Sequence, residues 1–256
     1  MVETTPRSPM TIGLIGYGRF GKLAAHYLSR YARVVVYDRR SAATAVHGAK
    51  IRRAPLAEVA SQPVVILAVP ISEMPRTLRA IRSHLVAGAL VADVCTVKVR
   101  PVAWMRGILP KSVSILGAHP LFGPDSVSGT LRGHRVILTP VRISGRLLRR
   151  IISRLSRAGI RATTMTPEHH DRMVAETILL THYVGRVVHD AALRRWANGT
   201  RSYGKLQEVV DVALNDTFQL LQDVWSYNPY SRSVAAALRR SERRLSLTLR
   251  SGPTRR

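Results

Sequence analysis

The segment Thr11–Gly21, which reads TIGLIGYGRFG, decides the fold of this chain. Its first half is a short apolar run of the kind that forms a buried strand, and its second half matches the pattern G-x-G-x-x-G through Gly16, Gly18 and Gly21. A helical pattern follows from Lys22 to about Arg30. Strand, glycine-rich turn and helix in this order predict the start of a dinucleotide-binding domain.

Each glycine has a physical task in such a turn. Gly16 permits the tight turn, and Gly18 lets the backbone approach a pyrophosphate at the positive end of the following helix. Gly21 allows the helix and the strand to pack closely. We assign the neighbouring Arg19 and Phe20 to the same cofactor site.

An acidic residue ends the next predicted strand. Arg33–Tyr37 is a β-branched run followed by Asp38, seventeen residues after Gly21. A carboxylate here can accept hydrogen bonds from an adenosine ribose and repels a 2′-phosphate, which favours NAD over NADP. Arg39 and Arg40 come next and can hold a 2′-phosphate, so NADP is left open.

Four further apolar runs extend the predicted sheet. They span residues 63–70, 89–94, 112–117 and 135–139. Near-continuous apolar runs are typical of parallel strands that are buried on both faces. Together with the glycine-rich turn, these runs predict a Rossmann-type, doubly wound α/β domain with ligands at the carboxyl ends of its strands. Val69 and Pro70 end the first of these runs and are assigned to the cofactor site.

Three polar side chains follow two of these strands. Thr96 and Lys98 come after the run 89–94, and His119 comes after the run 112–117, within GAHPLFGP. The chain thus delivers a hydroxyl, an ammonium and an imidazole to the edge where a nicotinamide is expected. Lys98 can attract a substrate carboxylate or simply cap its loop.

The C-terminal third has a helical pattern. Thr166 and Pro167 form a typical helix start, and Asn198-Gly199 and Asn228-Pro229 separate three predicted helices. We expect a dinucleotide-binding domain over residues 1–166 and an all-α domain over residues 167–256.

The composition narrows the classes of protein. The formal net charge is +25, but the basic residues are spread along all 256 positions, so we expect no specific nucleic-acid partner. A nucleic-acid-binding protein is the alternative that the charge alone supports.

The sequence contains no run of about 18 apolar residues, so we expect no membrane span. A single cysteine, Cys95, and no secretory h-region indicate a cytoplasmic protein. His169 and His170 are adjacent on a helix and point in different directions, so no metal site is expected.

The sequence resembles the prephenate and arogenate dehydrogenases of tyrosine biosynthesis. The resemblance rests on four segments in the family's order, GLIGYGRFG, DVCTVK, GAHPLFGPDS and HDRMVAETILLTHYVGR, and it covers most of the chain. THYVGRV and LNDTFQLLQDVWSYN are most similar to the plant-type arogenate branch. The resemblance implies an NAD(P)-dependent oxidative decarboxylation of arogenate or prephenate, giving tyrosine or 4-hydroxyphenylpyruvate. It also implies a homodimer joined through the helical domain.

The resemblance further implies roles near the cofactor. His119 matches the family's catalytic histidine, and a neutral imidazole there can take the proton of the substrate hydroxyl as hydride departs. Thr96 stands where the family usually has serine, and its hydroxyl can orient His119 or the substrate. Ser126 is a weaker candidate for the same pocket.

Residues of the helical domain complete the implied substrate site. His182 stands at the spacing of a family histidine that meets the substrate, and Arg186, one turn later, can bind a carboxylate. Asp216 falls where arogenate-specific members have an acid, which suits the ammonium of arogenate. Another reductase of the same architecture, acting on a small hydroxy or keto acid, is the second alternative. Such enzymes often use a helical-domain lysine, and Lys205 shows no such motif.

Overall fold

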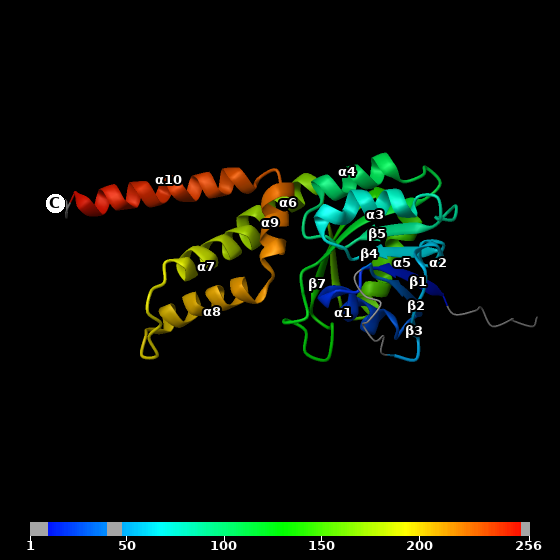
Figure 1. Cartoon of the computed structure of the whole chain (residues 1–256), viewed down its shortest axis with the longest axis horizontal. Helices are drawn as coiled ribbons and strands as arrows, with labels where there is room; N and C mark the ends of the chain where they lie inside the picture. The colour runs from blue at the N-terminus through cyan, green and yellow to red at the C-terminus, as the bar shows by residue number, and fades with distance from the viewer. Residues whose placement is uncertain (1–9, 40–47, 252–256) are drawn as a thin grey trace, which may run out of the picture. The chain divides into compact units, whose positions relative to one another are not determined.

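The computed structural model of the chain describes residues 10–39 and 48–251 (Figure 1). Arg40 therefore lies outside the described residues. The chain divides into two compact units, Met1–Pro167 and Glu168–Arg256. Within the described part of the chain, no helix is long and apolar enough to cross a membrane.

The first unit is built on an eight-stranded sheet with the order β3-β2-β1-β4-β5-β6-β7-β8. The strands are β1 (Thr11–Ile15), β2 (Arg33–Tyr37), β3 (Ile51–Arg53), β4 (Val64–Leu67), β5 (Leu90–Asp93), β6 (Ser114–Pro120), β7 (Arg135–Arg142) and β8 (Arg161–Thr164). Strands β1 to β6 are parallel, β7 is antiparallel to β6, and β8 is parallel to β7. The strand order changes direction between β1 and β4, which is where such sheets bind dinucleotides.

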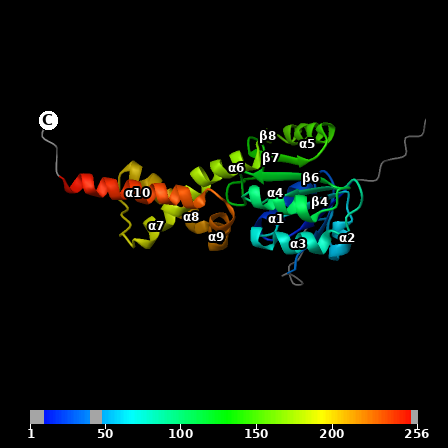
Figure 2. The same ribbon diagram turned by 90° about the horizontal axis from the view of Figure 1, so that it is seen from above.

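Helices cover both faces of this sheet, as Figure 2 shows for α3 and α5. The helices are α1 (Arg19–Leu28), α2 (Leu56–Ala60), η1 (Ile71–Glu73), α3 (Met74–Ile81), α4 (Val99–Ile108) and α5 (Gly145–Arg157). On β4, Val64 packs against the cluster under α5 and Ile66 packs against the cluster under α1. Alternate residues of a strand share a face, so α1 and α5 cover the same side. The opposite side carries α2 and α4, which contact β1 and β6.

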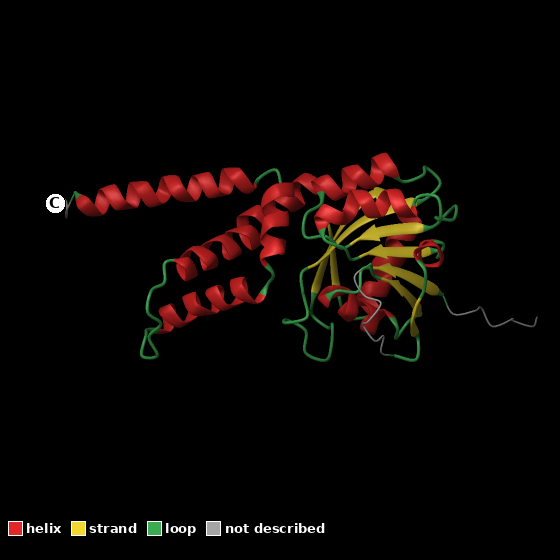
Figure 3. Ribbon diagram, in the orientation of Figure 1, coloured by secondary structure: helices red, strands yellow, loops and turns green. Residues whose placement is uncertain are grey.

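The described elements of the second unit are all helical, and they are red in Figure 3. They are α6 (Pro167–Val174), the π-helical turn η2 (Ala175–Leu179), α7 (Leu180–Asp190), α8 (Arg201–Asn215), α9 (Phe218–Tyr227) and α10 (Ser231–Arg250). Helices α7 and α8 pack closely at Gly185, where a Cβ would lie 2.6 Å from the Cβ of Ala213. A larger residue at position 185 would therefore push the two helices apart.

The second of the three predicted helices, between Asn198-Gly199 and Asn228-Pro229, is in fact two helices. Asp216 is extended at the end of α8, and Thr217 caps α9 by accepting a hydrogen bond from the backbone N–H of Leu220. Asp and Thr compete with helical backbone bonds through their own side chains, which explains the break. As a result, Asp216 lies in a turn between two helices.

A buried polar contact fastens α6 to the turn between α9 and α10. His170 Nδ1 lies 2.8 Å from Asp171 Oδ1, and both side chains are fully buried. The side-chain amide of Asn228 donates a hydrogen bond of 2.7 Å to the main-chain oxygen of Asp171. This His-Asp pair therefore belongs to the packing of the helical unit.

Candidate active site

A cavity of about 290 Å³ lies at the carboxyl ends of β1, β2 and β4. Six of the predicted cofactor residues line it: Gly16, Gly18, Asp38, Arg39, Val69 and Pro70. Its other lining residues are Ile15, Tyr37, Leu56, Ala68, Glu73, Arg76, Thr77 and Ala80. The contribution of η1 and α3 was not predicted from the sequence, although a helical segment that directly follows β4 must begin at this edge of the sheet.

The glycines of the turn explain the shape of this cavity. Gly16 has φ +99°, and a Cβ there would lie 2.3 Å from the carbonyl oxygen of Ala68. A Cβ on Gly21 would lie 2.1 Å from the carbonyl oxygen of Gly16, so Gly21 is needed for packing and does not line the cavity. A Cβ on Gly18 would meet no described atom within 4 Å. Gly18 thus borders open space, as a backbone that approaches a pyrophosphate should.

The charged residues at the end of β2 are held in place. The carboxylate of Asp38 accepts a hydrogen bond of 2.6 Å from the backbone N–H of Tyr17, which ties it to the glycine turn. The guanidinium of Arg39 forms an ion pair of 3.2 Å with Glu73 on η1. One of the two arginines expected near a 2′-phosphate is therefore engaged by a carboxylate.

Arg19 and Phe20, which the sequence also assigns to the cofactor site, do not line this cavity. The guanidinium of Arg19 lies 2.5 Å from the carboxylate of Asp125. The rings of Phe20 and Phe122 have centroids 6.5 Å apart. Both residues thus join the start of α1 to the loop that follows His119. The partners lie about one hundred positions away in the sequence, so no local pattern could have predicted these contacts.

His119 is the penultimate residue of β6. It therefore lies inside the strand and not after it, as the sequence had suggested. Leu116 and Ala118 pack on the α5 side, so Gly117 and His119 point to the opposite face. The residue is 5% exposed and pairs in register with Ile137 on β7. The end of β6 lies three strand spacings from the end of β1, or about 14 Å, on the same edge of the sheet.

Thr96 and Lys98, on the loop after β5, have different surroundings. Thr96 is half-buried. The side chain of Lys98 is fully buried and forms an ion pair with Asp93, the last residue of β5. The interpretation of Lys98 as a ligand for a substrate carboxylate therefore needs correction, because its ammonium is enclosed and already faces a carboxylate.

Ser126 also departs from the expectation. It is exposed, and its hydroxyl accepts a hydrogen bond of 2.9 Å from the backbone N–H of Gly123. The same hydroxyl lies 3.2 Å from the carbonyl oxygen of Gly123. The side chain therefore closes its own turn, which is a local role.

Three predicted substrate residues meet in the second unit. His182 Nε2 lies 3.4 Å from Asp216 Oδ2, and the guanidinium of Arg186 donates a hydrogen bond of 3.0 Å to the main-chain oxygen of Asp216. The same guanidinium lies over the ring of Phe218. Burial lowers the pKa of His182, the carboxylate of Asp216 raises it, and Arg186 lowers it again. The net lowering favours a neutral imidazole beside a carboxylate and a guanidinium.

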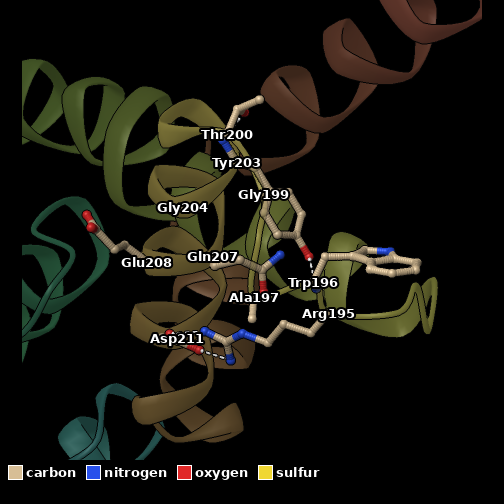
Figure 4. A pocket seen from close by; sticks show the side chains of 10 residues that line it. All are labelled: Arg195, Trp196, Ala197, Gly199, Thr200, Tyr203, Gly204, Gln207, Glu208 and Asp211. Carbon is tan, nitrogen blue, oxygen red and sulfur yellow. Dashed lines mark hydrogen bonds and ion pairs between the residues drawn. The ribbon is translucent and has the colours of Figure 1, made fainter.

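A second cavity, of about 240 Å³, lies where the connection from α7 meets α8 (Figure 4). Its charged groups pair with each other, because Arg195 contacts both carboxylate oxygens of Asp211 at 3.1 and 2.8 Å. The backbone N–H of Trp196 donates to the hydroxyl of Tyr203 at 3.3 Å. None of the predicted catalytic, substrate or cofactor residues lines this cavity.

A mostly parallel sheet with a glycine-turn cavity at its switch point defines a nucleotide-binding α/β protein, and sequence comparison identifies the family. Residues 24–163, more than half of the chain, match the family described as prephenate dehydrogenase, nucleotide-binding domain. The chain belongs to this family.

Curated relatives include plant and bacterial enzymes. Arogenate dehydrogenase 2, chloroplastic, of Arabidopsis thaliana is 29% identical over 238 residues, which are 89% of this chain and 66% of the relative. Cyclohexadienyl dehydrogenase of Zymomonas mobilis is 29% identical over 188 residues, which are 68% of this chain and 64% of the relative. The chain therefore spans just under two thirds of the length of these two relatives, and 36% of that of arogenate dehydrogenase 1 of Arabidopsis thaliana.

Solved structures share the fold. Prephenate dehydrogenase from A. aeolicus, in complex with hydroxyphenyl propionate and NAD+, superposes with a TM-score of 0.76 at 22% identity, over 96% of this chain and 93% of that chain. Synechocystis arogenate dehydrogenase superposes with a TM-score of 0.70 at 22% identity, over 94% and 92%. At this level of identity the similarity establishes the fold.

Proposed function

We propose that the chain is an NAD-dependent dehydrogenase that converts arogenate to tyrosine by oxidative decarboxylation, with prephenate as the second candidate substrate. The observation that carries the proposal is the position of His119. It lies on the same edge of the sheet as the glycine-turn cavity, at about the length of an extended dinucleotide from the end of β1.

The residues of the first unit fit a dinucleotide. Gly18 leaves open space for a pyrophosphate, the N-terminus of α1 faces it, and Asp38 can accept hydrogen bonds from an adenosine ribose. NAD, when bound, would accept the hydride. The unit that holds these residues matches a nucleotide-binding family along most of its length.

His119 supplies the proton acceptor. In the proposed reaction the carbon that bears the hydroxyl loses hydride, the hydroxyl loses its proton to the imidazole, and the ring carboxylate leaves as carbon dioxide. The electron pair of the broken carbon–carbon bond makes the ring aromatic, and the imidazolium of His119 then returns the proton to the phenolate oxygen of the product. The protein mainly has to align the groups and hold one proton. In this proposal Thr96, which is half-buried on the loop after β5, uses its hydroxyl to orient them.

The helical unit supplies the substrate contacts in this proposal. His182, Arg186 and Asp216 form one cluster, in which the guanidinium suits a carboxylate and the Asp216 carboxylate suits an ammonium. Arogenate carries an amino acid side chain and prephenate carries a keto acid there. The carboxylate in this cluster is the reason for favouring arogenate.

We also propose that the helical unit forms a homodimer. Ten of the twelve exposed large apolar side chains among the described residues belong to it, including Leu193, Trp196 and Phe218. Exposed apolar surface of this extent is typical of an interface. Sedimentation velocity tests this proposal, and a monomer at all concentrations would contradict it. A cytoplasmic location is part of the same proposal and is supported by the lone cysteine, Cys95.

The test of the function is a matrix of initial rates with arogenate and prephenate, each with NAD and NADP. We expect the highest kcat/KM with arogenate and NAD. Asp216→Asn should lower kcat/KM for arogenate more than for prephenate, because only arogenate loses an ion pair. If the chain oxidises simple hydroxy acids but neither arogenate nor prephenate, the proposal is wrong and the reductase alternative replaces it.

A further inference from the structure

We propose that Glu73 sets the cofactor preference of the glycine-turn cavity by engaging Arg39 and by placing a second carboxylate beside Asp38. The site would then discriminate against a 2′-phosphate on the adenosine ribose more strongly than Asp38 alone can achieve. This inference rests on the proposed function, because it concerns the nucleotide that the cavity takes.

Four charged residues line the cavity, and Arg76 on α3 is one of them. Asp38 and Arg39 follow β2, Glu73 is the last residue of η1, and all three line the cavity. The ion pair between Arg39 and Glu73 measures 3.2 Å and is only partly exposed. The backbone N–H of Tyr17 holds Asp38 at 2.6 Å. Both carboxylates therefore have fixed partners at the lining of the cavity.

The charges explain why this arrangement selects against a 2′-phosphate. A phosphate monoester carries nearly two negative charges at neutral pH, and enzymes that take NADP commonly offer it an arginine near the end of the second strand. Here the candidate arginine, Arg39, already pairs with a carboxylate. A bound 2′-phosphate would have to break that pair and would then lie near two negative groups. A ribose hydroxyl has neither problem.

The ion pair between Arg39 and Glu73 reconciles two opposing signals in the sequence. Asp38 predicts NAD, whereas the arginine that follows it predicts a phosphate site. Glu73 lies 34 positions further along the chain, so the local pattern gives no sign that it neutralises Arg39. The pairing converts a residue that would favour NADP into one that holds a second carboxylate in place.

The experiment measures binding of two ligands that lack the nicotinamide ring, ADP-ribose and 2′-phospho-ADP-ribose, by calorimetry on the full chain at low ionic strength. The quantity of interest is the ratio of their dissociation constants. In Glu73→Gln, we expect the preference for ADP-ribose to fall roughly threefold to tenfold, because one negative charge is removed and Arg39 is released. In the double variant Arg39→Gln/Glu73→Gln, the preference for ADP-ribose should return most of the way to the wild-type value.

Glu58→Gln is the matched control. It also removes one carboxylate from an Arg–Glu ion pair of the same unit, with Arg52, but neither partner lines the cavity. An equal change of the ratio in this variant would show that net charge is responsible and would overturn the inference. An unchanged ratio in Glu73→Gln would also overturn it.

Failure of the proposed function gives a different result. If the wild-type chain binds neither ligand, the cavity is not a dinucleotide site, and both the proposed function and this inference are wrong. If it binds ADP-ribose but Glu73→Gln leaves the ratio of the two dissociation constants unchanged, only the inference is wrong.

Discussion

The buried ammonium of Lys98 pairs with the carboxylate of Asp93, and the pair lies on the same face of the sheet as His119. Asp93 is in register with Gly117, two residues before His119 on β6. The side chain of Lys98 packs over Gly117, where a Cβ would lie 3.1 Å from its Cδ. A charged pair is thus built into the layer beneath the candidate catalytic residue.

Replacing Lys98 by methionine should destabilise the first unit severely. The change keeps the apolar stem but leaves the Asp93 carboxylate buried without its counter-charge, which typically costs about 3–5 kcal/mol. Urea denaturation followed by circular dichroism measures the loss. Lys111→Met, at an exposed position, serves as the control. If the two variants unfold at the same urea concentration, the burial of Lys98 is not as described.

Two glycines of the turn should respond to alanine in opposite ways. Gly18→Ala should fold normally, because the new Cβ has space and Gly18 has an ordinary φ of −72°, but it should weaken binding of ADP-ribose at least about tenfold by entering the cavity. Gly21→Ala should instead lower the melting temperature, because its Cβ would overlap the carbonyl oxygen of Gly16. Thermal melting and calorimetry on both variants test the contrast. Equal effects of the two changes on stability would contradict it.

The stability of the helical unit should depend on pH through His182. Burial lowers its pKa below the ordinary value of 6.5, so the unfolded chain takes up the proton at a higher pH than the folded chain does. The contribution of His182 to stability is therefore complete well above pH 6.5 and is lost as the pH falls through that value toward the lower folded pKa. Urea denaturation between pH 5 and 8 measures how the free energy of unfolding changes with pH. This dependence on pH should be weaker in His182→Gln than in the wild-type chain.

Asp216 should act on the same titration. Its carboxylate raises the pKa of His182, so Asp216→Asn should lower that pKa further. An NMR titration of the His182 ring measures the change directly. A higher pKa in the variant would contradict the pairing at 3.4 Å.

His119→Asn should reduce kcat by about 10²–10⁴-fold, because the substrate hydroxyl loses its proton acceptor. Asparagine can still donate and accept hydrogen bonds, so the layer around β6 should remain folded. The measurement is the initial rate of NADH formation, with the melting temperature as the check on folding. Full activity of a folded variant would assign the proton to another group.

Much of the sheet could be predicted from the sequence, because buried parallel strands produce continuous apolar runs and the glycine turn indicates a doubly wound domain. Strands β1, β2 and β4 to β7 were each predicted within a few residues. Strand β3 was missed, since its three residues, Ile51–Arg53, are too short and too basic to give a pattern. The break between α8 and α9 was missed because the apolar spacing continues across Asp216 and Thr217.

The candidate site was predictable where the residues act through local backbone geometry. Gly16, Gly18 and Asp38 line the cavity as their spacing indicates. The sequence could not show which charges are already neutralised, because ion pairs such as Arg39–Glu73 and Arg19–Asp125 join segments far apart in the chain. Pairing of this kind depends on which elements pack together, and a one-dimensional pattern does not contain that information.

The most direct test of the central claim is the stoichiometry of the reaction with arogenate and NAD. NADH, carbon dioxide and tyrosine should form in equal amounts, because the substrate loses its hydride and its ring carboxylate in the same turnover. Formation of NADH without carbon dioxide, or no reaction of a protein that binds ADP-ribose, would contradict it.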